Sequence, residues 1–83
     1  MNDLVKLTEE IVKSLVMDEE GVSVKEFPSE EENVMLIQVM VNADDIGRVI
    51  GKDGRVANAI RTLVQASSAL QDNKYVKIDI DKF

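Results

Sequence analysis

The sequence predicts an α+β fold in which helices pack on one face of a three-stranded sheet, with the element order α-β-β-α-α-β. Apolar residues recur at helical spacing in some segments and alternate or run continuously in others, and polar turns separate the two kinds. The chain has 83 residues, 45% of them hydrophobic and 31% charged. These values fit one small globular domain over residues 1–83 with a single core.

The first predicted element is an amphipathic helix over residues 3–17. Asn2 or Asp3 can cap its first turn, and a run of acidic residues ends it. Its apolar residues repeat at helical spacing: Leu4, Leu7, Ile11, Val12 and Leu15. The alternating residues 22–27 then predict a short strand, and residues 28–33 form a polar turn.

The most hydrophobic run, residues 34–41, predicts a strand because of its length and its β-branched content. One face would carry Met35, Ile37, Val39 and Val41, and the other Val34, Leu36 and Met40. Since both faces are apolar, this strand is either central in the sheet or covered by a partner on its second face.

Two consecutive helices and a last strand complete the order. Residues 42–45 are predicted to cap a short helix that ends near Ile50. A longer helix follows over about residues 55–70, with Val56, Ile60, Leu63 and Val64 inward and Asn58, Arg61 and Gln65 outward. A polar turn at 71–74 leads to residues 75–81, whose alternation predicts the final strand.

The loop Gly51-Lys52-Asp53-Gly54 lies between the two consecutive helices. Glycine allows a positive φ and a close approach of another backbone, and Lys52 and Arg55 add positive charge at that point. A helix that starts near Gly54 also points its unpaired N–H groups there, which suits a phosphate. This is the layout of a GXXG loop that clamps a nucleic-acid backbone. The alternative is a helix–helix turn whose glycines serve only as caps.

Charge is distributed unevenly along the chain. The net charge is −6, which by itself disfavours a nucleic-acid partner. Residues 46–71, however, carry a local balance of +3, and the remainder carries −9. Because distant exposed charges are screened at physiological salt, a basic patch on an acidic body can still bind an anion. We expect such binding to be weak and sensitive to salt.

Several functional classes are disfavoured by composition. The chain has no cysteine and no histidine, so thiolate metal sites and the commonest general base are missing, and neither a metal nor a cofactor is expected. Enzymatic phosphate chemistry is the nearest alternative. A P-loop needs four residues between its glycines and a hydroxyl after the lysine, whereas Gly47 and Gly51 enclose three residues and Asp53 follows Lys52. No apolar run is long enough to span a membrane, and a cytoplasmic location is the expectation.

The segment Ile50-Gly51-Lys52-Asp53-Gly54-Arg55 resembles the I-G-x-x-G signature of the KH domains. The predicted element order matches the type II topology of that family, in which helices cover one face of a three-stranded mixed sheet. With Val49 before this segment and Ala59-Ile60-Arg61 after it, the chain is similar to the bacterial KhpA-type RNA-binding proteins. The match covers nearly the whole chain.

The resemblance implies a shallow groove that holds about four nucleotides of single-stranded RNA with low sequence specificity. The implied RNA-binding residues surround the loop: Arg48, Val49, Ile50, Gly51, Lys52, Asp53, Gly54, Arg55, Asn58 and Arg61. Four apolar residues would form the groove floor or belong to the core: Ile46, Val49, Ile50 and Ala57. No aromatic residue lies in this region for stacking on bases. Asp53 either repels phosphate or points away to cap the next helix.

The resemblance also implies protein partners. KhpA-type proteins form homodimers and pair with a larger KH-containing RNA-binding protein of the KhpB type, a pairing linked to cell elongation and division. The alternative is a protein–protein interaction or adaptor module that binds little RNA itself. In that case the apolar side chains Val34, Leu36 and Met40 would form an exposed patch for a partner. No membrane partner is expected.

Overall fold

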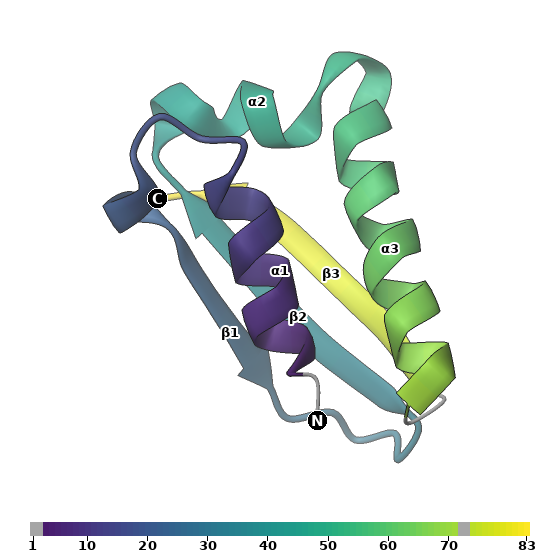
Figure 1. Ribbon diagram of the computed structural model, residues 1–83. Coiled ribbons are helices and arrows are strands. Elements are labelled where there is room, and N and C mark those ends of the chain that lie inside the picture. The colour runs from purple at the N-terminus through teal and green to yellow at the C-terminus, as the bar shows by residue number, and fades with distance from the viewer. Residues whose placement is uncertain (1–2, 72–73) are drawn as a thin grey trace.

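The computed structural model describes residues 3–71 and 74–83 (Figure 1). Its helices and strands are α1 (Leu4–Lys13), β1 (Ser23–Phe27), β2 (Val34–Val41), α2 (Ile46–Ile50), α3 (Arg55–Gln71) and β3 (Tyr75–Lys82). One-turn 3₁₀ helices lie at Glu19–Gly21, Ala43–Asp45 and Lys52–Gly54. The predicted order α-β-β-α-α-β is confirmed. Asn2, one of the two predicted caps, and residues 72–73 of the predicted turn lie outside the described residues.

The sheet has the strand order β1-β2-β3, with β1 antiparallel and β3 parallel to β2. This is the mixed sheet that was predicted, and β2 is its central strand. Parallel neighbours need a crossover connection, which α2 and α3 supply between β2 and β3. Figure 1 shows the helices on one side of the sheet, with the α2–α3 loop beyond its end.

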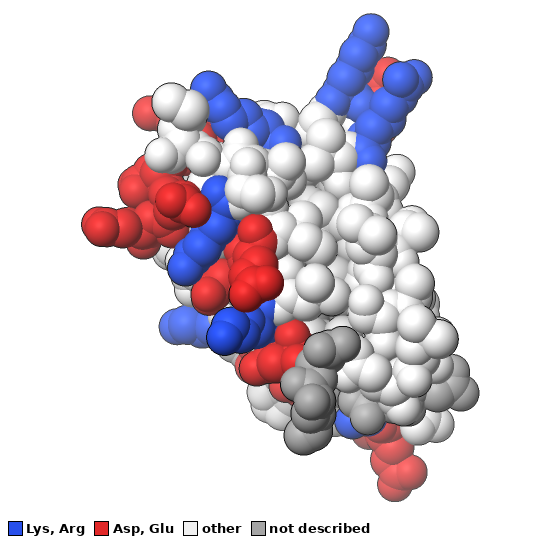
Figure 2. Space-filling view, viewed as in Figure 1, with Lys and Arg blue, Asp and Glu red and all other residues white. Residues whose placement is uncertain are grey.

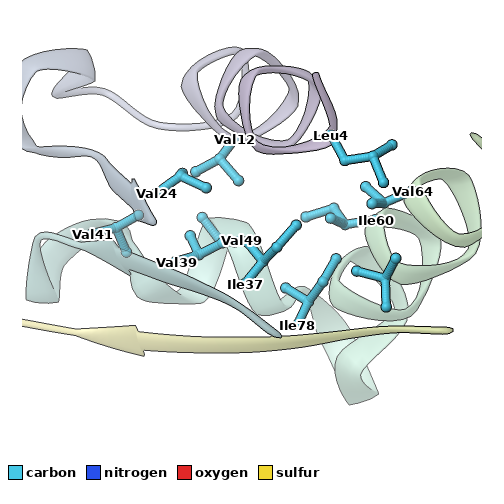
Figure 3. Packing of buried hydrophobic residues seen from close by; sticks show 11 residues of the cluster. Leu4, Val12, Val24, Ile37, Val39, Val41, Val49, Ile60, Val64 and Ile78 are labelled. Carbon is cyan, nitrogen blue, oxygen red and sulfur yellow. The ribbon is translucent and has the colours of Figure 1, made fainter. Parts of the chain in front are cut away.

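The core lies between the helices and the inner face of the sheet (Figure 3). From β2, Ile37, Val39 and Val41 are buried, whereas the residues between them are only partly buried, so the predicted alternation is confirmed. The helices contribute Leu4, Val12, Val49, Ile60 and Val64. Complete burial of one such side chain stabilises the fold by about 1.5–3 kcal/mol. The opposite face of the sheet carries Val34, Leu36 and Met40 half-buried.

The first helix is shorter than predicted. Asp3 caps α1 as expected, since its carboxylate accepts hydrogen bonds from two N–H groups of the first turn. The helix ends at Lys13, not at Met17. The backbone N–H of Met17 instead donates to the Asp45 carboxylate at 3.0 Å, and the N–H of Asp18 donates to it at 3.2 Å. A contact with a distant residue therefore replaces the last helical turn.

The predicted side-chain caps of α2 are wrong. Neither Asn42 nor Asp45 forms a cap hydrogen bond with the helix that follows it. The Asn42 amide donates to the carboxylate of Asp18, and the Asp45 carboxylate faces the backbone of Met17 and Asp18. These hydrogen bonds join the α1–β1 connection to the start of α2, and they give the buried carboxylate of Asp45 the donors that it needs.

The inner face of α3 also differs from the prediction at two positions. Its buried residues are Ala57, Ile60, Val64 and Ser68, and Val56 is partly buried against the core. Leu63, predicted inward, is 55% exposed. Gln65, predicted outward, turns its amide to the start of β3, where it donates to Lys74 O at 2.9 Å and accepts from Val76 N at 2.9 Å. The edge of β3 needs these partners, which places Gln65 inward.

Candidate nucleic-acid interface

The loop between α2 and α3 has three residues with positive φ: Gly51 at 75°, Asp53 at 56° and Gly54 at 76°. The N–H of Gly51 donates to Gly47 O at 2.9 Å, which closes α2. The two loop glycines have different surroundings. A Cβ on Gly51 would lie 2.8 Å from Cβ of Val56, whereas a Cβ on Gly54 would meet nothing within 4 Å. Packing and backbone conformation together require glycine at 51, and backbone conformation alone favours it at 54.

Positive side chains project from this loop. Lys52 and Arg55 are exposed, and in the described part of the chain neither forms an ion pair or a side-chain hydrogen bond. Figure 2 shows Lys and Arg side chains extending where the α2–α3 loop lies in Figure 1, with an acidic side chain between them. Acidic side chains gather on another side of the molecule. The loop therefore offers two unpaired cations to an anion.

Asp53 remains exposed beside these cations. Among the described residues its carboxylate accepts no hydrogen bond from the first turn of α3, so the helix cap, which was one of the two alternatives for Asp53, is not formed. Its φ of 56° and ψ of 25° place it in the left-handed region, which aspartate tolerates better than most residues. The loop thus holds one acid among its cations, as the sequence indicated.

Two further predicted cations already have partners within the fold. Nη1 of Arg48 lies 3.3 Å from Asp44 O and 3.6 Å from Oδ1 of the buried Asp45. Nε of Arg61 donates to Ile78 O at 3.3 Å, and its Nη1 donates to the Asn58 side chain at 3.3 Å. Arg48 is therefore held at the start of α2, and Arg61 and Asn58 are held beside β3.

The predicted groove floor needs correction. Val49 and Ala57 are buried in the core, so their side chains cannot line an exposed floor. Ile46 and Ile50 are half-buried, and Ile46 packs against the core cluster. Apolar surface next to the loop comes mainly from Ile50 and Val56, each partly exposed.

A groove of about 460 Å³ between α3 and β3 was not predicted from the sequence. Its lining residues are Arg61, Thr62, Gln65, Ala66, Ala69, Tyr75 and Val76. Tyr75, whose side chain is 58% exposed, adds an aromatic ring to the lining of this groove. The predicted site residue Arg61 lines the same groove. Strand alternation in residues 75–81 was the available signal for the exposure of Tyr75, but only the packing of α3 beside β3 brings its side chain next to the C-terminal half of α3, away from the Gly51–Gly54 loop.

Two other features are absent from residues 3–71 and 74–83. No group of three or more acidic side chains there could hold a metal ion. No helix in the same residues is long and apolar enough to span a membrane.

The element order, the mixed sheet and the glycine loop between α2 and α3 define a type II KH domain. A family model described as "KhpA/KhpB, KH domain" matches residues 5–80. The chain belongs to this KhpA/KhpB family of KH domains.

Relatives support the same family over nearly the full chain. The RNA-binding protein KhpA of Clostridium perfringens (strain 13 / Type A) is 45% identical over 75 residues, which cover 90% of this chain and 96% of that protein. The RNA-binding protein KhpA of Caldanaerobacter subterraneus subsp. tengcongensis is 42% identical over 80 residues, covering 96% and 99%.

Two solved structures of Era share the fold. A crystal structure of Aquifex aeolicus Era bound to GDP·AlF4⁻ has a TM-score of 0.71 at 16% identity, covering 96% of this chain and 30% of that one. Era in complex with MgGDPNP and nucleotides 1506–1542 of 16S ribosomal RNA has a TM-score of 0.67 at 17% identity, covering 95% and 29%. At these identities the similarity concerns the fold alone.

Proposed function

We propose that this protein binds single-stranded RNA through the Gly51–Gly54 loop with low sequence specificity, and that it is not an enzyme. It acts in the cytoplasm as a homodimer or with a larger KhpB-type RNA-binding partner, in post-transcriptional regulation linked to cell elongation and division. The RNA-binding names of its relatives support the first part. The partner and the cellular role rest on the family resemblance.

One observation carries the RNA-binding proposal. Lys52 and Arg55 are exposed and unpaired beside a loop whose backbone is held open by two glycines with positive φ. Such a loop lets a phosphate approach the backbone closely while two cations neutralise its charge. The other polar residues implied at the site already have partners within the fold: Arg48, Asn58 and Arg61. To contact RNA, each must share these partners with the RNA or give them up.

The substitution Lys52→Asp tests this proposal. Binding of a labelled single-stranded oligoribonucleotide at low salt should be lost, because the loop cation becomes a second carboxylate beside Asp53. Lys6→Asp is the matched control, since Lys6 is exposed on α1 and the change of net charge is the same. Thermal unfolding of both variants checks the fold. Equal RNA affinity in the Lys52→Asp variant and the wild type would show that the loop is not the binding site.

The exposed face of α3 supports the homodimer. Leu63 is 55% exposed and Leu70 is 90% exposed, and Ala59 and Ala66 are exposed at the intervening turns of the helix. Because these residues follow one another at intervals of four, three and four positions, they form one uncharged stripe along the helix. The stripes of two copies can pack against each other around a two-fold axis, since no like charges meet there. A two-fold pairing of α3 helices therefore buries apolar surface that the monomer leaves in water.

Leu63→Lys places a charge in the middle of this stripe. Sedimentation equilibrium should then report a monomer where the wild type reports a dimer, while thermal unfolding extrapolated to low protein concentration remains similar. Leu36→Lys, on the outer face of the sheet, is the comparison variant. If that variant dissociates the dimer and Leu63→Lys does not, the sheet face is the interface.

An adaptor module with little RNA binding is the second candidate function. The half-buried Val34, Leu36 and Met40 on the outer face of the sheet favour it, together with the exposed Phe27 beside them. The two candidates differ in one measurement. An adaptor shows no RNA binding in the wild type at low salt, while still forming a complex with its protein partner.

A further inference from the structure

The outer face of the sheet is a second uncovered surface. The helices lie on the other side of the sheet, so no helix of residues 3–71 and 74–83 covers this face (Figure 1). The central strand β2 presents four half-buried side chains to it: Val34, Leu36, Gln38 and Met40. A depression of about 350 Å³ lies on the same face, with residues of all three strands around it. An uncovered apolar strip of this kind marks a surface for a partner.

The strand register places charged side chains on both sides of this apolar strip. Residues that pair across neighbouring strands lie on the same face of the sheet. One row across the three strands contains Lys25, Gln38 and Asp79, and the next contains Phe27, Leu36 and Lys77. One edge of the face therefore carries Lys25 and the opposite edge carries Asp79. In the part of the chain that the structure describes, neither side chain has an ion-pair partner.

This arrangement of side chains is complementary to itself. A second copy can face the surface around a two-fold axis that runs along β2, between the two sheets. The rotation places β1 of one copy against β3 of the other and keeps the rows level. Lys25 then lies opposite Asp79 of the second copy, and Phe27 lies opposite Lys77 of the second copy. Sheets packed face to face lie about 10 Å apart, a gap that lysine and aspartate side chains span together. Symmetry repeats each pair, so two ion pairs and two cation–π contacts flank the axis.

An axis across the strands fits this face less well. If it passes through a row, Lys25 faces Lys25 of the second copy, or Lys77 faces Lys77. If it passes between the two rows, Gln38 faces the apolar Leu36, and its amide is buried without a partner. With the axis along β2, Gln38 faces Gln38, and two side-chain amides can donate to and accept from each other.

We propose that the outer face of the sheet binds the same face of a second copy, around a two-fold axis along β2 and with Lys25 paired to Asp79 across it. This surface is separate from the uncharged stripe of α3, because that stripe belongs to the helix layer. One chain can therefore use both surfaces, and the sheet contact joins helix-paired dimers into larger assemblies. Three strands about 4.8 Å apart and about 26 Å long offer at most about 370 Å² of flat area, against about 800 Å² per partner in stable complexes. The sheet contact is therefore weak and forms only at high protein concentration.

The Leu63→Lys variant isolates the sheet contact, because its added charge blocks the stripe of α3. Sedimentation equilibrium of this parent should show a reversible monomer–dimer equilibrium as the protein concentration rises. Adding Lys25→Asp should weaken that association by about tenfold or more, and adding Asp79→Lys should do the same, because each change places two like-charged pairs across the axis. An equimolar mixture of the two variants should restore the association, since the mixed dimer contains one native and one reversed ion pair.

Lys6→Asp in the same parent is the matched control, since Lys6 is exposed on α1 and the change of charge equals that of Lys25→Asp. It should associate as the parent does, and thermal unfolding verifies that every variant is folded. Equal association of the single variants and the parent overturns the inference, and so does a mixture that associates no more strongly than either variant. A parent that stays monomeric at every concentration also overturns it and leaves the face to a different protein, as in the adaptor candidate.

The two self-association surfaces fail in different ways. If Leu63→Lys leaves the wild-type dimer intact and Lys25→Asp dissociates it, the sheet face is the homodimer interface and the stripe of α3 is not. If Leu63→Lys gives a monomer and the charge changes have no effect at high concentration, the pairing of α3 helices stands and the inference about the sheet is wrong.

Discussion

The side chain of Val56 occupies the space that a Cβ on Gly51 would need. Such a Cβ would lie 2.8 Å from Cβ of Val56 and 2.9 Å from the backbone nitrogen of Val56. Gly54 has open space at the same point of its backbone. Gly51→Ala should therefore destabilise the fold by about 2–4 kcal/mol, from overpacking and the left-handed φ together. Gly54→Ala should lower the free energy of unfolding by about 1–2 kcal/mol, because only the positive φ disfavours alanine there. Urea unfolding measures both, and equal losses would contradict the role of Val56.

Asp53→Asn should tighten RNA binding by about two- to fivefold at low salt, because it removes a carboxylate beside Lys52. Asparagine tolerates the left-handed backbone at this position, so stability should change little. A gel-shift titration measures the effect. The exposed Asp79 on β3 supplies the control, Asp79→Asn, which changes net charge equally away from the loop. An equal gain in both variants would point to overall charge as the cause.

Asp45→Asn should destabilise the protein by about 1.5–3 kcal/mol. The buried carboxylate of Asp45 accepts the N–H groups of Met17 and Asp18, and an amide can accept through only one of its two terminal atoms. Arg48→Ala should lose no more than about 1 kcal/mol, since the half-exposed guanidinium is screened by water. Urea unfolding compares the two. A larger loss for Arg48→Ala would mean that the ion pair, not the backbone contacts, holds this connection.

Gln65→Ala should destabilise the start of β3 by about 1–3 kcal/mol, because Val76 N–H and Lys74 O lose their partner. The amide proton of Val76 should exchange faster with solvent. Gln65→Glu retains an acceptor for Val76 N–H and loses only the donor to Lys74 O, so its amide exchange should stay closer to that of the wild type. Hydrogen exchange followed by NMR distinguishes the two variants.

Much of the fold could be predicted from local pattern. The strand over residues 34–41 matches the structure at both ends, because its alternating buried and partly buried residues reflect a period set by the backbone alone. The glycine loop was located correctly for a similar reason. A positive φ is a local backbone requirement, and a glycine in a turn of the sequence indicates where it occurs.

The errors occurred where a side chain serves a distant part of the chain. Asp45 looked like a helix cap but accepts N–H groups 27 and 28 residues away. Gln65 looked like a surface residue but completes the edge of β3. Periodicity carries no information about which strand edge or connection lacks a hydrogen-bond partner, so such roles need the tertiary structure.

The sequence by itself determined the α-β-β-α-α-β order, the central strand and the open glycine loop with its two cations, since these follow from backbone periods and glycine conformation. Only the tertiary structure decided which cations are unpaired. It holds Arg48 and Arg61 against the fold and leaves Lys52 and Arg55 exposed. It also buries Val49 and Ala57 and brings Tyr75 beside α3. Pairing and burial depend on neighbours that only packing brings together.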